Sequence, residues 1–266
     1  MRKKSLFSRL ALGTAAACIL LPVCLLVLWS VTARWSWPSL LPERWSLRTL
    51  RELFFGSQNL WQLLGGSVAL GGAAAAVSSA IGLLAARAVV LYDFPGKSLV
   101  RFVWLLPLLV PGPVFAVGIH LTLLRIGLAD TISGVLLVHV TASLPYSAAI
   151  LTDVTAALGG GLEEQAALLG ANPVQAFFAG SLPGLMPGIL SSLSMSFILS
   201  YSQYFTTLIV GGGRVKTLAL TLVPYIQGGD RSLASSYALA FTGSALLVFV
   251  VFEAFIHRGR KGDGGI

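Results

Sequence analysis

The sequence predicts an all-α integral membrane protein built on six transmembrane helices. Of its 266 residues, 56% are apolar and only 11% are charged, far from the composition of an average soluble protein. A helix that crosses a hydrocarbon core of about 30 Å needs roughly 20 apolar residues, so the chain has room for about six crossings and for no large soluble domain. Lys and Arg fall mainly in loops and at the chain ends, where they orient helices, so the net charge of +8 does not indicate nucleic-acid binding.

Six stretches without Asp, Glu, Lys or Arg locate these helices, because an unpaired charge in the middle of a bilayer is costly. They belong to a single transmembrane domain over residues 1–266, with spans at about 11–31, 62–86, 102–124, 131–152, 189–210 and 233–252. The first stretch is longer than the ~7–15-residue apolar region of a secretory signal, so we expect it to be a retained helix.

The segment between the first and second spans is predicted to lie flat on the bilayer surface. Leu47, Leu50, Leu53 and Phe54 share one face of a short helix, as in amphipathic helices that rest on membranes.

The connection between the fourth and fifth spans, about residues 153–188, is too broken to cross a membrane. Gly and Pro residues interrupt it, and in lipid they would leave backbone groups without hydrogen-bond partners. The interruptions are at Gly170, Asn172, Pro173, Gly180, Pro183, Gly184, Pro187 and Gly188. The connection must therefore lie in water or against protein, and its apolar character predicts a protein partner.

Two short helices are predicted within this connection. The first covers residues 163–169, because its acids lie near the start, where the helix dipole favours them, and Gly170 ends it. Asn172 suits an N-cap and is followed by proline, so the second should run over residues 173–179 and stop at Gly180.

This connection resembles the EAA motif of the permease subunits of ABC importers. That motif has Glu-Ala-Ala, three residues, Gly, nine residues, Ile, one residue and Leu-Pro. The positions that fall on the spacing are Glu164, Ala166, Gly170, Leu182 and Pro183. Gln165 replaces the first Ala and Gly180 replaces the Ile, while the distances from Glu to Gly and from Gly to Leu-Pro are kept. Length, span number and loop position extend the resemblance over nearly the whole chain.

The resemblance implies the type I permease fold and names the partners. The 153–188 connection would be a cytoplasmic coupling loop that inserts into one of two ATPase subunits, and a second permease subunit, identical or different, would complete the translocation path. An external binding protein would deliver the solute, and residues 34–59 offer an alternative role as a contact for it. ATP would be used by the separate ATPase, and this chain would bind no cofactor.

The same resemblance assigns roles to residues of the loop. Glu164 would pair with a basic group on the ATPase, and Gly170 would permit a sharp turn of the backbone. Val174, Phe177 and Phe178 would form an exposed apolar surface that is buried on docking. A cytoplasmic loop places both chain ends in the cytoplasm of a bacterial inner membrane protein. The basic cluster Arg2, Lys3, Lys4 and Arg9 favours the same orientation.

Candidate contacts for the solute are polar side chains within the spans. Tyr201, Gln203 and Tyr204 suit a polar solute, although packing contacts between helices are equally consistent with these side chains. His120 and His139 are candidates because ionisable groups at membrane depth are often functional, with a neutral histidine bonded inside the bundle as the alternative.

The nearest group within the family serves polyamines, thiamine, ferric iron and phosphonates. Polyamine permeases of this group tend to carry acids in the fifth span, and the corresponding residues 200–205 have none. A desolvated polycation needs a carboxylate partner, so this absence argues against a polyamine unless a second permease supplies the acid.

No enzymatic or metal site is predicted. Cys18 and Cys24 are six residues apart in the first span and lack the spacing of metal ligands. The sequence shows no Walker A motif, catalytic triad or paired carboxylates, so any ATPase must be a separate chain. The rival class is a secondary transporter driven by an ion gradient, in which Gly/Pro breaks would mark a discontinuous helix at the binding site.

Overall fold

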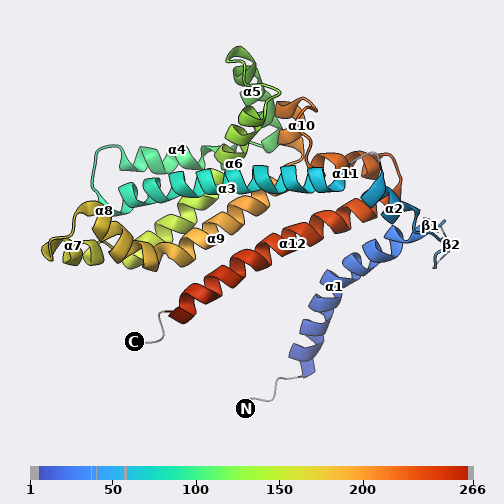
Figure 1. Ribbon diagram of the computed structural model, residues 1–266, viewed down its shortest axis with the longest axis horizontal. Coiled ribbons are helices and arrows are strands. Elements are labelled where there is room, and N and C mark those ends of the chain that lie inside the picture. Colours follow the sequence, from blue (N-terminus) through green and yellow to red (C-terminus); the bar gives the residue numbers. More distant parts are fainter. Residues whose placement is uncertain (1–5, 37, 40, 57–58, 263–266) are drawn as a thin grey trace. The chain divides into compact units, whose positions relative to one another are not determined.

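The computed structural model describes residues 6–36, 38–39, 41–56 and 59–262, and these are almost entirely helical (Figure 1). The elements are α1 (Leu6–Ser30), β1 (Thr32–Arg34), β2 (Arg44–Trp45), α2 (Arg48–Phe55), α3 (Leu60–Leu91), α4 (Lys97–Leu109), α5 (Gly112–Arg125), α6 (Ile132–Leu158), α7 (Gly161–Leu168), α8 (Pro173–Ala176), the π-helical η1 (Phe177–Ser181), α9 (Leu182–Tyr201), α10 (Phe205–Gly211), α11 (Leu218–Gln227) and α12 (Arg231–Gly262). Arg2, Lys3 and Lys4, used above to orient the N-terminus, lie outside the described residues.

The predicted all-α membrane fold is confirmed. Among the described residues, five helical segments are long and apolar enough to cross a membrane, and the bent pair of α4 and α5 makes a sixth if it counts as one span. When α4 and α5 count as one, four apolar segments begin before the 153–188 connection. The fifth begins within the connection and ends after it, and the sixth lies wholly after it, so the predicted order is kept.

The third predicted span, residues 102–124, is wrong as a single helix. The structure has two helices there, α4 and α5, and the chain bends by 108° between them at Val110 and Pro111. Pro111 stands before α5 with an extended backbone, and Pro113 occupies the first turn of α5. Proline cannot continue the hydrogen bonding of a preceding helix, so this pair ends α4 inside a stretch that carries no charge.

Two further predictions are wrong: that the second short helix stops at Gly180, and that the fifth span begins at residue 189. Residues from Pro173 to Tyr201 form one continuous apolar helix in which η1 is a wider, π-helical turn. The backbone N–H of Leu182 bonds to the carbonyl of Phe177, five residues back, and this shifted register admits Pro183 without ending the helix. The helix then ends at Tyr201, and α10 follows the break at residues 202–204.

The described residues form two compact units. The first comprises Met1–Leu64 and Thr221–Ser244, and the second comprises Gly65–Leu220 and Ala245–Ile266.

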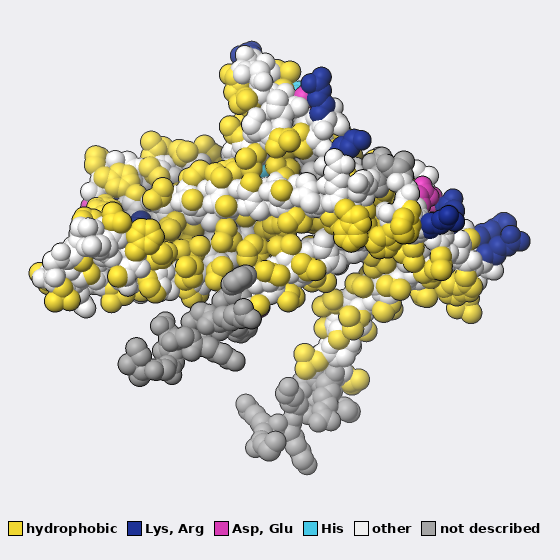
Figure 2. Space-filling view, in the orientation of Figure 1, with side chains coloured by type: hydrophobic (Ala, Val, Ile, Leu, Met, Phe, Trp, Pro, Cys, Tyr) yellow, Lys and Arg dark blue, Asp and Glu magenta, His cyan; other side chains and the backbone are white. Residues whose placement is uncertain are grey.

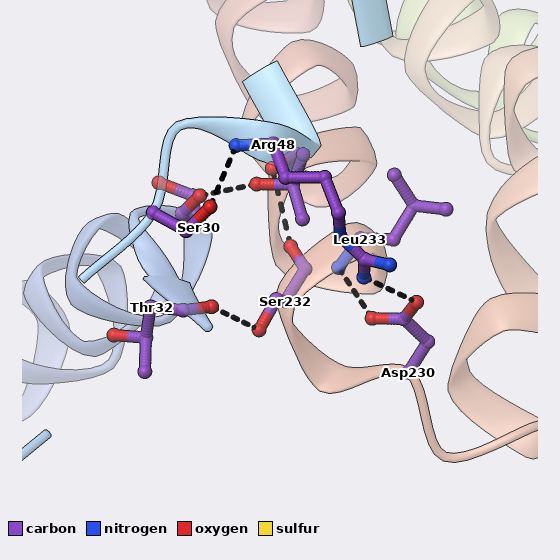
Figure 3. Close-up of polar contacts among 9 residues, drawn as sticks. Ser30, Thr32, Arg48, Asp230, Ser232 and Leu233 are labelled. Carbon is purple, nitrogen blue, oxygen red and sulfur yellow. Dashed lines mark hydrogen bonds and ion pairs between the residues drawn. The ribbon is translucent and has the colours of Figure 1, made fainter. Parts of the chain in front are cut away.

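Polar contacts between α1, α2 and α12 organise the first unit (Figure 3). The hydroxyl of Ser232 donates to the carbonyl of Thr32 at 2.6 Å. Asp230 accepts from the backbone N–H of Leu233 at 3.1 Å, which caps α12, and pairs with the guanidinium of Arg48 at 3.3 Å. The predicted amphipathic helix is present as α2, with Leu53 buried inside the unit while Leu47 and Phe54 remain exposed.

Small residues let α3, α6 and α9 pack closely in the second unit. A Cβ added at Gly82 of α3 would lie 2.9 Å from the Cβ of Ser147 in α6, and one at Gly188 of α9 would lie 2.7 Å from Val154 in α6. Close approach of this kind is typical of helices in membranes, where small residues at the interface permit extensive contact.

Serine hydroxyls join the same three helices. Ser79 of α3 bonds to Ser192 of α9 at 2.8 Å, and Ser147 of α6 bonds to Ser196 of α9 at 2.7 Å. All four are buried, so each pair satisfies groups that lipid could not.

Candidate functional site

The 153–188 connection contains two short helices joined by a tight turn at Gly170. The helix α7 ends in a Schellman motif, in which Gly170 donates to the carbonyl of Ala167 and Ala171 donates to that of Ala166, each at 3.0 Å. Gly170 has φ +90°, a conformation that residues with a Cβ rarely adopt. The predicted turn at Gly170 is therefore confirmed.

Asn172 begins the second helix with a complete capping box. Its side-chain oxygen accepts from the backbone N–H of Gln175 at 2.9 Å, and the side chain of Gln175 accepts from the N–H of Asn172 at 3.1 Å. Pro173 occupies the first turn of α8, as predicted. Local sequence chemistry therefore fixes both ends of the turn between the two helices.

Exposed apolar side chains cover this pair of helices. Leu168 and Leu169 are 88% and 89% exposed, and Val174 and Phe178 are 64% and 60% exposed. Figure 2 shows hydrophobic side chains interspersed with other atoms over α7 and α8. We call these four residues the apolar loop surface. Phe177, predicted to belong to it, is instead half-buried beneath Arg87.

The other predicted loop residues lie on or beside this surface. Glu164 is exposed in the first turn of α7, and Pro183 is exposed at the start of α9. Ala166 and Leu182 are half-buried. The structure thus brings the residues of the predicted motif together in one short segment.

An ion pair that sequence reasoning missed ties α7 to α3. Arg87 of α3 donates from Nη1 and Nη2 to the two carboxylate oxygens of Glu163, at 2.6 and 2.9 Å. The guanidinium carbon also lies 4.6 Å from the ring centre of Phe177. The available signal was Arg87 itself, a charge within an apolar helix that requires an acidic partner.

The pairing with Arg87 lowers the pKa of Glu163 below its ordinary value of 4.5, mainly through the hydrogen bonds from the guanidinium. A carboxyl whose pKa is depressed in the folded state stabilises that state above its ordinary pKa, and this stability is lost as pH falls through the folded value. We therefore expect limited proteolysis of the loop to accelerate below pH 4.5. In Glu163→Gln, cleavage should be faster at neutral pH and should show a weaker acid-dependent rise. A rise of equal size in both proteins would contradict this role of Glu163.

The candidate solute contacts surround the break between α9 and α10. Tyr201 is buried and stacks on Phe197, with ring centres 5.2 Å apart. Gln203 and Tyr204 lie in the break itself and are half-buried, and Gln203 accepts a hydrogen bond from Thr206 at 2.7 Å. These contacts provide a packing role for Tyr201 and Gln203.

His139 bridges the same break from α6. Its Nδ1 lies 2.8 Å from the hydroxyl of Ser200 in α9, and its Nε2 lies 3.0 Å from that of Thr207 in α10. Thr207 donates its proton to the carbonyl of Gln203, so it must accept from Nε2–H of His139. Both ring nitrogens of His139 are therefore occupied by protein partners.

His120 lies apart from this cluster, on α5. It is half-buried, and its Nδ1 has no hydrogen-bond partner within the described structure. Among the described residues no group of three or more His, Cys, Asp or Glu side chains is placed to hold a metal ion.

Comparison with known proteins identifies the family. The model of the family described as "Binding-protein-dependent transport system inner membrane component" matches residues 78–258, more than half of the chain. The chain belongs to this family. The matched region contains the two short helices, the break at residues 202–204 and the Arg87–Glu163 pair.

Relatives of this permease include importer subunits with different named cargoes. The putrescine transport system permease protein PotI of Escherichia coli is 28% identical over 226 residues, which cover 82% of this chain and 79% of PotI. The probable sulfate transport system permease protein cysT of Nephroselmis olivacea is 32% identical over 52% of this chain and 53% of its own. The molybdate/tungstate permease WtpB of Pyrococcus abyssi is 27% identical over 64% and 67%.

The protein is thus a multi-pass inner membrane permease of an ABC importer and not a secondary transporter. Its family consists of the membrane subunits of transport systems, which work with ATPase and binding-protein partners.

Proposed function

We propose that the apolar loop surface docks onto a cytoplasmic ATPase and receives the movement that drives import. The observation that carries this proposal is the exposure of Leu168, Leu169, Val174 and Phe178 on both sides of the turn at Gly170. Exposed apolar patches bounded by polar residues are typical of protein interfaces. Glu164 lies exposed beside them and is available to a basic group of the partner.

The docking proposal fixes the orientation of the chain. Four membrane crossings precede the loop when α4 and α5 count as one, and two follow it. Both numbers are even, so a cytoplasmic loop places both chain ends in the cytoplasm. Two such permease subunits, identical or different, would enclose the path of a small polar solute, and each would engage one subunit of an ATPase dimer that binds and hydrolyses ATP.

Charge placed on the apolar loop surface should weaken ATPase binding. Buried apolar anchors commonly contribute 2 kcal/mol or more to an interface, so we expect Leu168→Asp combined with Leu169→Asp to weaken binding at least ~30-fold. The measurement is the affinity of the purified permease for its co-encoded ATPase in nanodiscs.

The matched control is Leu41→Asp, because Leu41 is 77% exposed but lies between α1 and α2, far along the chain from the loop. This variant should bind the ATPase as the parent does. Unchanged affinity in the double loop variant would refute docking through this surface.

Mass spectrometry of the ligand that co-purifies with the binding protein identifies the cargo.

A further inference from the structure

Arg87, Glu163 and Phe177 form a cluster that joins three elements on the inner side of the apolar loop surface. Arg87 belongs to α3, Glu163 to the first turn of α7, and Phe177 to the start of η1. The side chains of Arg87 and Glu163 are only 15% and 20% exposed. Because the guanidinium holds the carboxylate through two parallel hydrogen bonds, the pair fixes both distance and orientation between α3 and α7.

The backbone alone would connect α7 loosely to the spans. Gly159, which has φ +67°, and Gly160 connect the end of α6 to Gly161, the first residue of α7. Gly170, also left-handed, follows the other end of α7. Glycines at both ends allow α7 to rotate with little backbone resistance. A displacement of α7 would be absorbed at these joints unless a side-chain contact held the helix to a rigid element.

α3 is such an element. It is a continuous helix of 32 residues. Within the second unit it is bound to α9 through the Ser79–Ser192 hydrogen bond and through close contact of Gly71 with the ring of Phe197. A force applied at Arg87 would therefore reach the body of the helix rather than a flexible end.

We infer that Arg87 is the positioning residue through which movement of α7 is transmitted to α3. The inference rests on the proposed docking of an ATPase at the apolar loop surface. η1 and α9 form one continuous helix with α8, and so provide a covalent route from the same loop. Arg87 adds a second, non-covalent connection, through which the movement of α7 reaches α3. A single substitution can remove this connection.

A thiol on α3 can report this movement. Ala73 is exposed and lines a cavity of about 340 Å³ in the second unit, also bordered by Leu136 and Lys216. The Ala73→Cys variant, with Cys18→Ser and Cys24→Ser to remove the native thiols, is assembled with the co-encoded ATPase in nanodiscs. The rate of labelling by a small maleimide is compared without nucleotide and with ATP plus vanadate, and ATPase affinity is measured on the same samples.

With Arg87 intact, we expect nucleotide to change the labelling rate at least ~3-fold. Arg87→Gln should abolish this change while ATPase affinity stays within about twofold of the parent. The exchanged pair Arg87→Glu with Glu163→Arg should recover part of the change, because the opposite charges again face each other. Lys97→Gln is the matched control, since Lys97 contacts Asp93 and the carbonyl of Tyr92, both within five residues of it, and it should leave the change intact.

Three results would overturn the inference. The first is a nucleotide-dependent change that survives Arg87→Gln. The second is that Arg87→Gln loses ATPase affinity together with the nucleotide-dependent change in labelling rate, which would show that Arg87 only stabilises the docking surface. The third is that the Ala73→Cys protein with Arg87 in place binds the ATPase but shows no nucleotide-dependent change in its labelling rate. Failure of the intact protein to bind the ATPase would instead refute the proposed docking itself.

Discussion

Valine in place of Gly170 should uncouple ATP hydrolysis from solute uptake. The backbone at Gly170 has φ +90°, where a β-branched residue is strained by roughly 1–3 kcal/mol. No atom lies within 4 Å of an added Cβ, so the strain arises from the backbone and not from a clash. Relief of that strain requires the Schellman bonds at the end of α7 to break, which would separate Leu168 and Leu169 from Val174 and Phe178.

The expected readout is a drop of at least ~10-fold in uptake by proteoliposomes, with ATP hydrolysis persisting, because a strain of ~1.4 kcal/mol corresponds to one decade. Gly96→Val is the matched control, since Gly96 has the same φ of +90° in the turn before α4, outside the loop, and a Cβ there also meets nothing. Gly170→Asn should retain most of the uptake, because asparagine tolerates left-handed backbone conformations. Normal uptake by the valine variant at Gly170 would contradict the requirement for this turn.

The end of α7 and the start of α8 were predictable from sequence because short-range chemistry determines them. Gly170 supplies the left-handed residue of the Schellman motif, and Asn172 supplies the cap of α8. Both signals depend on residues within one or two helical turns. The apolar, charge-free stretches likewise predicted the apolar helices in their order along the chain, and their number where α4 and α5 count as one span, since lipid imposes that composition locally.

The course of helices through proline was harder to predict, because it depends on hydrogen-bond register. Gly180 and Pro183 have the chemistry of a helix end, yet a π-helical turn carries the chain through them. Pro111 lies in an equally apolar stretch, and there the chain bends sharply. Composition cannot distinguish these outcomes, because packing around each proline decides between a wider turn and a break.

Contacts between distant residues lay beyond sequence patterns altogether. Arg87 and Glu163 are 76 positions apart, and although Arg87 within an apolar helix requires an acidic partner, no sequence pattern selects Glu163 as that partner. Phe177 was predicted to be exposed because its neighbours are, and it is covered by a side chain from a helix far away in the sequence. The candidate site was therefore predictable as a segment, whereas its attachment to the spans was not.

Leucine in place of His139 should destabilise the second unit by about 1–3 kcal/mol, because two hydrogen bonds between helices are lost and such bonds in membrane proteins contribute up to ~1.7 kcal/mol each. The imidazole is 1% exposed and joins Ser200 in α9 to Thr207 in α10. Its loss should also release the break at residues 202–204, where Gln203 and Tyr204 lie. The measurements are thermal unfolding in detergent and hydrogen exchange of the α10 amides, which should accelerate.

His120 supplies a control with the same change of side chain and the opposite expectation. Its half-buried ring has an Nδ1 without a partner in the described structure, so His120→Leu removes an unsatisfied polar atom and should leave stability equal or slightly higher. A double-mutant cycle with Thr207→Val then isolates the bond from His139, because the combined loss of stability should fall short of the sum of the two single losses by the energy of that bond. Equal effects of the two histidine substitutions would show that His139 acts as a space-filling residue, and that packing alone holds α9 and α10 together.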